Sequence, residues 1–283
     1  MKVDTIVFDL EGVVYRSGIP IPGAISALHR LSALGFTLGF FTNASVHTRE
    51  QLLLKLRNMG VNARSTNQLA TSCHALADYF ITQGITGIPV LVIGEAALEE
   101  ELKVTSNQLR RVSDAESDTQ QPIAAVAMGF CSNFSYDHLL CAQQCILDGA
   151  RFYATDIDPF YPDVTGKFYP AIGWQVAAVM LTTGVRPVIV GKPESYMIRS
   201  LLGDLGAQPS STLVVGDSAW SDIQAGNRAG CRTCLVRSGI PQDLLKRVIA
   251  ENNYLKPERP DELLPDFAIE TICDLESQVL DKL

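Results

Sequence analysis

The strongest constraint on the fold comes from a short apolar run near the start of the chain, within residues 5–15. Residues 6–8 favour β structure and carry no polar interruption, which is typical of a strand buried on both faces of a parallel sheet. Asp9 follows this run directly, and Glu11 and Gly12 come next. Open α/β sheets bind ligands beyond the carboxyl ends of their strands, so Asp9 is expected to serve chemistry rather than packing. Taken alone, the same residues are as typical of an acidic loop that turns at a glycine.

Three later apolar runs are also followed by polar side chains. They span residues 37–41, 188–190 and 213–215. The polar side chains after them are hydroxyls, an amide, an ammonium and two carboxylates: Thr42, Asn43, Ser45, Lys192, Asp217 and Asp222. If all four runs lie parallel in one sheet, their ends gather these groups in one crevice. Such a set suits a phosphate ester held together with Mg²⁺.

Helical patterns between the runs indicate how the chain returns from one strand to the next. Residues 22–34 place four aliphatic side chains on one stripe, and the segment that starts at Thr48 resembles a capping box. Further helices are predicted over residues 171–183, 197–205, 222–229 and 271–283, with an edge strand over residues 267–269. Strands that alternate with helices form βαβ units, so the predicted fold class is α/β with a Rossmann-like, doubly wound parallel sheet.

The chain spends about 150 residues between Asn43 and Lys192, whereas a strand–helix–strand unit needs only about 30. A second α/β unit is therefore expected here. Its elements are β-rich runs over residues 90–93, 123–128 and 151–154 and helical patterns over residues 95–102 and 136–147. The predicted division is a discontinuous core of residues 1–78 and 179–283 with an inserted α/β cap domain of residues 79–178. Residues 113–122 are expected to form a surface loop.

Composition excludes several classes of protein. The chain has 47% hydrophobic and 19% charged residues, an ordinary globular composition. Its formal charge of −8 argues against nucleic acid or a membrane surface as the main partner, since both demand basic patches. Asp4 and Asp9 interrupt what would be the apolar part of a signal peptide, and no apolar stretch approaches the ~20 residues of a membrane helix. Seven scattered cysteines favour reduced thiols and a cytoplasmic location.

The polar segments carry a resemblance to a known family. Asp9-x-Glu11-Gly-Val, Thr42-Asn-x-Ser, Gly-Lys192-Pro and Gly-Asp217-x-x-x-x-Asp, in this order, resemble the four motifs of the haloacid dehalogenase superfamily of aspartate-nucleophile phosphatases. The long insertion, the Pro-Gly-Ala start of the first helix and residues 154–170 resemble more narrowly its NagD-like, p-nitrophenylphosphatase-type branch, subfamily IIA. The resemblance implies a Mg²⁺-dependent phosphatase that acts on a small phosphorylated metabolite, with association into a homo-oligomer through the cap as a further expectation.

The resemblance also implies a nucleophile and a metal site. Asp9 would attack the phosphate and form an aspartyl-phosphate. The Asp9 carboxylate, the backbone carbonyl of Glu11 and the Asp217 carboxylate would ligate Mg²⁺, while Asp222 would hold a metal-bound water. The alternative is that Asp217 and Asp222 are ordinary acids at the start of a helix, favoured there by the helix dipole.

Three more residues would contact the transferring phosphoryl group by the same resemblance. Thr42 would donate a hydrogen bond to a phosphoryl oxygen, with Asn43 beside it, and Lys192 would neutralise charge on Asp9 and the phosphate. A turn at the end of a strand would explain Thr42 and Asn43 equally well, and a lysine is more often solvated at the surface. Ser45 lies within reach by sequence and has no assigned role.

Glu11 departs from the family pattern, which usually places an aspartate two residues after the nucleophile. That aspartate protonates the leaving group and then activates water. Glutamate has the same chemistry on a longer arm, and a misplacement of ~1 Å can cost on the order of 10²-fold in rate. The alternative function is therefore a catalytically weak relative that keeps the metal and phosphate site as a binding or scaffold protein. A flavodoxin-like phosphoacceptor domain also uses an aspartate and Mg²⁺, but the long insertion argues against it.

The inserted segment departs from the branch pattern as well. The branch usually shows A-T-N-P-D followed by P-G-A-G-S, whereas this chain has A-T-D-I-D over residues 154–158 and P-A-I-G-W over residues 170–174. Asp156 and Asp158 are the candidate substrate-binding residues of the cap, with Tyr161 and Trp174 beside them. Turn and packing roles would explain these four residues equally well.

Overall fold

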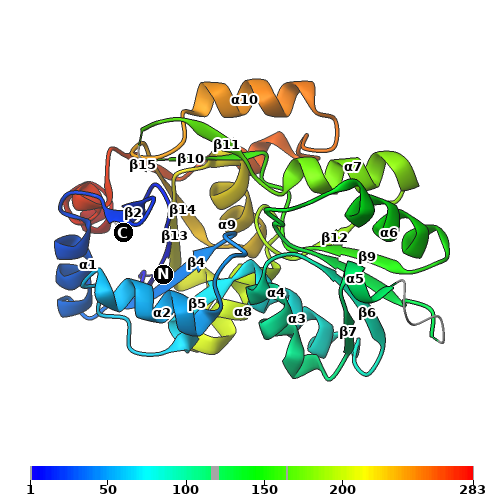
Figure 1. The fold of residues 1–283 in the computed structure, drawn as a ribbon. Helices are drawn as coiled ribbons and strands as arrows, with labels where there is room; N and C mark the ends of the chain where they lie inside the picture. Colours follow the sequence, from blue (N-terminus) through cyan, green and yellow to red (C-terminus); the bar gives the residue numbers. More distant parts are fainter. Residues whose placement is uncertain (1, 116–120, 164, 283) are drawn as a thin grey trace.

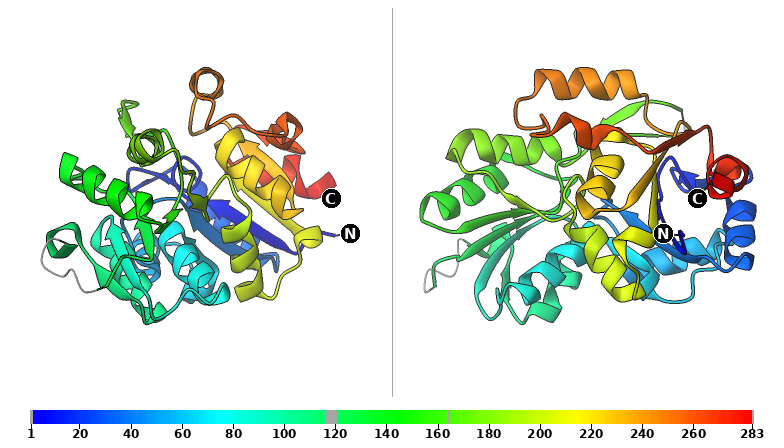
Figure 2. Two further views of the ribbon diagram at one scale, coloured as in Figure 1. Left: turned by 90° about the vertical axis from the view of Figure 1, so that its right-hand side faces the viewer. Right: turned by 180° about the vertical axis from the view of Figure 1, so that it is seen from behind.

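Most of the strands belong to two parallel sheets. The computed structural model of the protein describes residues 2–115, 121–163 and 165–282. Figure 1 shows the two sheets side by side with helices around them, and the views in Figure 2 show the same two halves from the side and from behind. The α/β class and the Rossmann-like parallel core are as predicted.

The first sheet has six strands, and every neighbouring pair is parallel. In spatial order the strands are β15 (Phe267–Ile269), β14 (Arg232–Val236), β13 (Thr212–Gly216), β1 (Thr5–Asp9), β4 (Thr37–Thr42) and β5 (Leu69–Thr71). All five residues of β1 are buried, as expected for the middle of a sheet covered on both faces. The carboxyl ends of β1, β4 and β13 therefore meet at one edge.

The second sheet has five parallel strands from the inserted segment. In spatial order they are β12 (Val188–Ile189), β9 (Arg151–Ala154), β8 (Ala125–Met128), β6 (Pro89–Ile93) and β7 (Gln108–Arg110). The run at residues 188–190 was expected in the first sheet, and this prediction is wrong because β12 pairs with β9. The predicted domain boundaries stay a prediction. β12 belongs to the sheet of the inserted segment, although the prediction placed its residues in the core.

Helices cover both sheets. They are α1 (Ala24–Ala33), α2 (Arg49–Asn58), α3 (Ser72–Thr82), α4 (Ala96–Leu102), α5 (Val112–Ala115), α6 (Tyr136–Leu147), α7 (Gly173–Thr183), α8 (Tyr196–Leu205), α9 (Gln224–Ala229), α10 (Gln242–Glu251) and α11 (Leu275–Gln278). Two short antiparallel hairpins complete the fold: β2 (Tyr15–Arg16) with β3 (Ile19–Pro20), and β10 (Phe160–Pro162) with β11 (Phe168–Pro170). The capping box at Thr48 is confirmed, since Thr48 and Gln51 bond reciprocally at the start of α2.

Apolar packing joins the two halves. One buried cluster contains Val7 and Phe41 of the first sheet, Val90 and Ala125 of the second, and side chains of α3 and α8. Burial of such side chains is the main source of stability in a fold of this kind. The two sheets therefore share a core at their junction, and the cavity described below lies in a packed setting. Within the described residues, none of the helices has the length and apolar character needed to cross a membrane.

Some elements differ from the sequence-based predictions. The closing helix over residues 271–283 is wrong, because α11 covers four residues between short 3₁₀ turns. The helix at residues 222–229 begins as a π-helical turn over Ala219–Ile223 and continues as α9. Half of the predicted surface loop at residues 113–122, residues 116–120, lies outside the described residues, and the prediction is wrong for residues 113–115, which belong to α5. α10, which crosses the top of the molecule in Figure 1, has no counterpart among the predicted helices.

Candidate active site

A buried ion cluster lies where the two sheets meet. Lys192 Nζ donates to Asp9 Oδ1 at 2.5 Å and to Asp222 Oδ1 at 2.7 Å. All three side chains are almost completely shielded from solvent. Asp9 ends β1 and Asp222 lies in the π-helical turn after β13, so the two acids come from adjacent strands of the first sheet. Lys192 follows β12 and reaches them from the second sheet.

Asp217 completes the acidic group. It follows β13 directly, and its Oδ2 accepts a hydrogen bond from the Ile240 backbone N–H at 2.7 Å. A Cβ at Gly12 or Gly239 would fall within 2.4 Å of Asp217 Oδ2, so only glycine at both positions leaves room for this carboxylate. The turn at Gly12 also has a φ of 82°, which favours glycine. The backbone of Gly12 lies so close to the Asp217 carboxylate that the turn after β1 requires a glycine.

The donor set fits a hard divalent cation. Asp9, Asp217 and Asp222 each offer an oxygen within 4.8 Å of the others. With all three ionised and Lys192 protonated, the cluster has a net charge of −2 in a buried place, which is costly without a further cation. Oxygen ligands from carboxylates are those that Mg²⁺ prefers. The candidate metal ligands predicted from sequence are therefore together, while a role for the Glu11 backbone carbonyl stays a prediction.

Burial and neighbouring charges shift the pKa values of the residues in this cluster. Burial raises the pKa of Asp9 to about 8 against the opposing pull of Lys192, and burial together with Asp222 raises the pKa of Asp217 well above its usual range. Burial alone would lower the pKa of Lys192, but Asp222 and Asp9 outweigh it and hold that pKa above its ordinary value. Lys192 is therefore a permanent cation, and bound positive charge would favour ionised carboxylates.

The segment after β4 ties this cluster to the inserted half. Asn43 accepts the Lys192 backbone N–H at 2.9 Å, and its amide donates to the Lys192 carbonyl and to Asp158 Oδ2, both at 3.0 Å. Ser45 Oγ accepts the Phe130 backbone N–H at 2.9 Å. Thr42 is buried and lines the cavity. Asn43 thus acts as a clamp on Lys192, whereas its predicted contact with phosphate stays a prediction.

Glu11 lines the same cavity and binds the β2–β3 hairpin. Its Oε1 accepts the backbone N–H of Ser17, in the turn of the β2–β3 hairpin, at 2.5 Å. Burial raises the pKa of Glu11 against the effects of the Ser17 hydrogen bond and of Lys55. A carboxyl with a raised pKa is better suited to donate a proton near neutral pH. The glutamate side chain, one methylene longer than aspartate, reaches Ser17 of the hairpin.

The four candidate cap residues have different surroundings. Asp158 binds Asn43, and burial raises its pKa to about 6. Asp156 accepts the Thr155 hydroxyl and the Asp158 N–H, so its carboxylate is held by its own loop. Both acids and Tyr161 line the cavity, whereas Trp174 packs edge-on against Phe134 and is not among the lining residues. Substrate contacts by Asp156 and Asp158 stay predictions.

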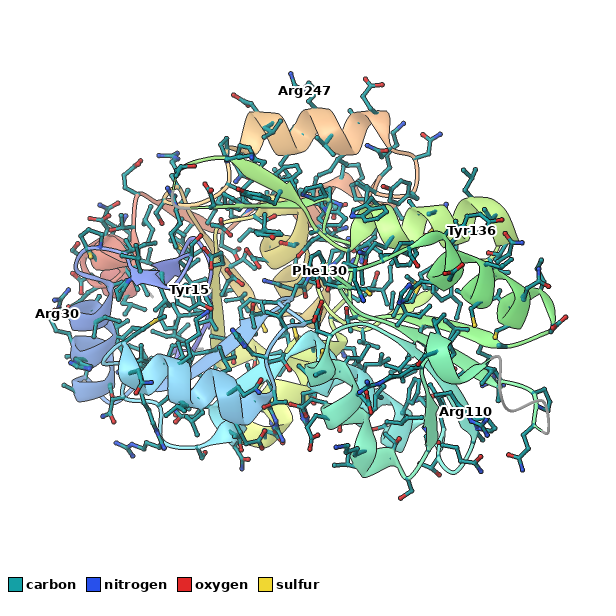
Figure 3. All side chains as sticks on the ribbon, viewed as in Figure 1. Tyr15, Arg30, Arg110, Phe130, Tyr136 and Arg247 are labelled. Carbon is teal, nitrogen blue, oxygen red and sulfur yellow. The ribbon has the colours of Figure 1, made fainter. Side chains whose placement is uncertain are left out.

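The cluster opens into a cavity of about 310 Å³ between the two halves. Its lining includes four residues that were not singled out from sequence: Tyr15, His47, Lys55 and Phe130. Figure 3 shows Tyr15 in the half that holds the first sheet and Phe130 at the junction with the other half. Lys55 belongs to α2, where a lysine in an amphipathic pattern normally indicates the solvated face. No local signal in the sequence distinguishes it from such a lysine.

Comparison with known families matches both ends of the chain. A family profile described as haloacid dehalogenase-like hydrolase matches residues 6–106, and a second, HAD-hydrolase-like profile matches residues 189–269. The two matches contain the four polar segments that follow the apolar runs. They leave out most of the second sheet.

Individual proteins match over nearly the whole chain. Phosphoglycolate phosphatase 2 of Arabidopsis thaliana is 30% identical, with 97% of this chain and 92% of the relative covered. Ribonucleotide monophosphatase NagD of Escherichia coli K12 is 32% identical, with 85% and 90% covered. The crystal structure of a glycerol phosphate phosphatase from Mycobacterium tuberculosis in complex with magnesium is 26% identical, with a TM-score of 0.79 and with 97% of this chain and 76% of that chain covered. All three names describe phosphatases.

Proposed function

The chain belongs to the haloacid dehalogenase-like hydrolases and is a phosphatase of their NagD-like branch, and we propose that it is Mg²⁺-dependent and hydrolyses a small phosphate monoester through an aspartyl-phosphate at Asp9. One observation carries this proposal: Asp9, Asp217 and Asp222 lie together with Lys192 in a buried cluster that opens into a small cavity. Such a cluster can hold an anionic phosphoryl group beside a nucleophile in a site shielded from water.

The first half of the reaction transfers the phosphoryl group to the protein. An Asp9 carboxylate oxygen attacks phosphorus, and the bond to the ester oxygen breaks. Lys192, fixed by Asn43 through its backbone, keeps a positive charge beside the carboxylate and the transferring group. The Thr42 hydroxyl is placed on the cavity wall to donate to a phosphoryl oxygen. Glu11 gives a proton to the leaving oxygen.

The second half releases phosphate. Glu11, now a carboxylate, takes a proton from water, and the oxygen of that water attacks phosphorus of the aspartyl-phosphate. The bond between phosphorus and the Asp9 oxygen breaks, so Asp9 is restored and inorganic phosphate leaves. The Ser17 N–H steadies Glu11 in its charged form through the hydrogen bond described above. A rotation of the Glu11 side chain between Ser17 and the ester would serve both proton transfers.

The metal would be held by Asp9 and Asp217, with Asp222 in a supporting position. Asp217 has one oxygen bound to the Ile240 N–H, while both oxygens of Asp222 are bound, one to Lys192 and one to the Ser218 N–H. Asp217 is therefore better placed to ligate directly. Bound Mg²⁺ would supply positive charge for the phosphoryl oxygens.

A second candidate function rests on Glu11. Because its carboxylate binds Ser17 in the hairpin, a protein that binds metal and phosphate without turnover is the alternative. The two functions differ in a simple assay. The wild-type chain and Asp9→Asn are incubated with Mg²⁺ or with a chelator and a set of monoesters: 2-phosphoglycolate, glycerol phosphate, a ribonucleoside monophosphate and p-nitrophenyl phosphate. Phosphate release that needs both Asp9 and Mg²⁺ supports hydrolysis, and release from none of the esters would refute it.

A further inference from the structure

One wall of the cavity carries a positive charge that the reaction described above does not use. Two lysines line the cavity, Lys192 and Lys55. Lys192 is paired with two carboxylates, as described above. Lys55 comes from α2, on the side of the cavity formed by the first sheet and its helices, where it lies with Tyr15 and His47.

Lys55 contacts the Tyr15 side chain, and in the described part of the chain it forms no ion pair. Its Nζ lies 4.4 Å from the centroid of the Tyr15 ring and 3.4 Å from the Tyr15 hydroxyl. Among residues 2–115, 121–163 and 165–282, no carboxylate lies within ion-pair distance of Lys55. A cation–π contact of this type is weaker than a buried ion pair. A half-buried ammonium with so weak a set of partners can bind an anion strongly.

Neighbouring groups place this charge beside the reacting centre. His47 and Glu11 line the same cavity as Lys55. The backbone of Glu11 forms a β-bridge with that of Tyr15, and Lys55 contacts the Tyr15 ring. Burial lowers the pKa of Lys55, and the charge of Glu11 partly offsets this effect. Lys55 therefore lies on the side of Glu11, the group that would protonate the leaving oxygen. This side receives the part of the substrate that departs.

We propose that Lys55 binds a second anionic group, a carboxylate or a further phosphate, on the leaving part of the substrate. The inference rests on the proposed function and narrows its substrate class to small phosphorylated acids. The cavity of about 310 Å³ suits a molecule of this size. The two cap acids that line the cavity do not oppose such a group directly, because Asp158 is bound to Asn43 and Asp156 to its own loop.

The test compares acidic and uncharged leaving groups in the full-length chain with Mg²⁺. The substrates are 2-phosphoglycolate for a carboxylate, a short diol bisphosphate for a second phosphate, and glycerol phosphate for an uncharged leaving group. The variants are Lys55→Gln and Lys55→Arg, with Lys246→Gln as a matched control, since Lys246 is exposed on α10. Lys55→Gln should lower kcat/KM for the better acidic substrate by at least about tenfold, mainly through KM. The loss for glycerol phosphate should be at least about five times smaller.

Lys55→Arg should restore most of the preference, because it restores the charge, and Lys246→Gln should leave the preference as in the wild type. Equal losses on all substrates would overturn the inference, since Lys55 would then act on Glu11 rather than on substrate. A wild type that does not favour either acidic substrate would overturn it as well. Calorimetric binding of the same compounds separates the two proposals. Binding that favours the acids and needs Lys55, without turnover, would sustain the inference and refute the proposed hydrolysis.

Discussion

The two sides of the cavity differ in how their charges are satisfied. On the phosphoryl side, defined by Asp9, Lys192, Asp217 and Asp222, each charged side chain is nearly inaccessible and has a partner. On the leaving-group side, defined by Glu11, Tyr15, His47 and Lys55, the charged groups are partly exposed. Lys55 contacts the Tyr15 ring and hydroxyl and forms no ion pair with a described carboxylate.

This difference indicates separate roles for the two sides: catalysis on the phosphoryl side and discrimination among substrates on the leaving-group side. The phosphoryl side is held by two sheets at once, because Lys192 enters from the second sheet and Asn43 fixes its backbone. Preorganised charge of this kind serves a reaction that is the same for every phosphate ester. On the leaving-group side, the charge of Lys55 is available to the part of the substrate that differs among esters. The substitutions below remove a charge or a proton donor from one side, or from the support behind it, and are given in order of decreasing expected effect.

The largest effect is expected on the phosphoryl side, from Asp9→Asn. Loss of the nucleophile should lower kcat on the order of 10⁴-fold or more, because the amide cannot form the acyl phosphate. The preference among substrates in a binding assay should survive, since the leaving-group side is untouched. Asp4→Asn, in the exposed segment just before β1, is the control and should keep wild-type turnover. Asp9→Asn with a tenth of wild-type kcat would contradict the assignment.

The next effect is expected from Glu11 on the leaving-group side. Glu11→Gln should lower turnover by roughly 10²–10⁴-fold, because the amide cannot transfer the proton. The loss should be smaller for p-nitrophenyl phosphate, whose leaving group needs little protonation. Glu11→Asp should also lower turnover, because the shorter arm cannot keep the contact with Ser17 and still reach the ester. A higher steady-state rate in Glu11→Asp would contradict this prediction and would mean that the longer glutamate side chain lowers turnover.

A smaller effect distinguishes the two acids after β13. Asp217→Asn should weaken Mg²⁺ binding by more than about 100-fold, whereas Asp222→Asn should weaken it by about tenfold, a typical cost of losing a supporting group. Both oxygens of Asp222 are already bound, and one oxygen of Asp217 is not required by the Ile240 contact. Titration calorimetry with Mg²⁺ measures both affinities. Equal affinity in the wild type and Asp217→Asn would remove Asp217 from the metal site.

The smallest effect concerns the support behind Lys55. Glu101 of α4 accepts the backbone N–H of Arg49, the first residue of α2, at 2.8 Å and pairs with His74 at 3.3 Å. Burial alone would raise the pKa of Glu101, but the hydrogen bonds from His74 and Arg49 outweigh it and hold that pKa below its ordinary value. Its charge therefore stabilises the folded state above the pKa of the unfolded chain, and this contribution is lost as pH falls through the folded pKa.

Urea unfolding between about pH 6 and pH 3 measures this contribution. The stability of the wild type should fall more steeply with acidification than that of Glu101→Gln. Glu100→Gln is the matched control, because Glu100 is exposed and pairs with Lys103 in the same turn. Its slope should equal that of the wild type. A Glu101→Gln variant with the wild-type slope would mean that the tie between α4 and α2 carries no charge-dependent stability.

The sequence predicted most of the fold because its evidence is local. Uninterrupted apolar runs identified β1, β4 and β13 and three strands of the inserted segment, β6, β8 and β9, and the capping box at Thr48 located the start of α2. The run at residues 188–190 was assigned to the wrong sheet because an apolar run has the same appearance whichever neighbour it pairs with. Pairing is decided by long-range packing. α10 was not predicted although its local signal is clear, since Leu245, Val248 and Ile249 have the spacing of one helix face.

The candidate site divides in the same way. Asp9, Lys192 and Asp217 were predicted because each stands within two residues of the end of an apolar run, and Asp222 because it belongs to the same motif as Asp217. The clamp formed by Asn43 depends on a contact with a residue 149 positions away, and Lys55 lies within a helix whose local pattern resembles any amphipathic helix. Local patterns therefore identified Glu11 and the groups of the phosphoryl side, while Tyr15, His47 and Lys55 required the tertiary structure.

The central claim, that Asp9 carries the phosphoryl group during turnover, can be tested by trapping. The wild type is mixed with p-nitrophenyl phosphate and Mg²⁺, quenched in acid within the first turnover and digested at low pH, and the peptides are measured by mass spectrometry. The account predicts that the peptide with Asp9 gains the mass of one phosphoryl group, and that Asp9→Asn shows no such gain. Turnover in which no phosphorylated Asp9 peptide is found, or in which another residue is phosphorylated, would contradict it.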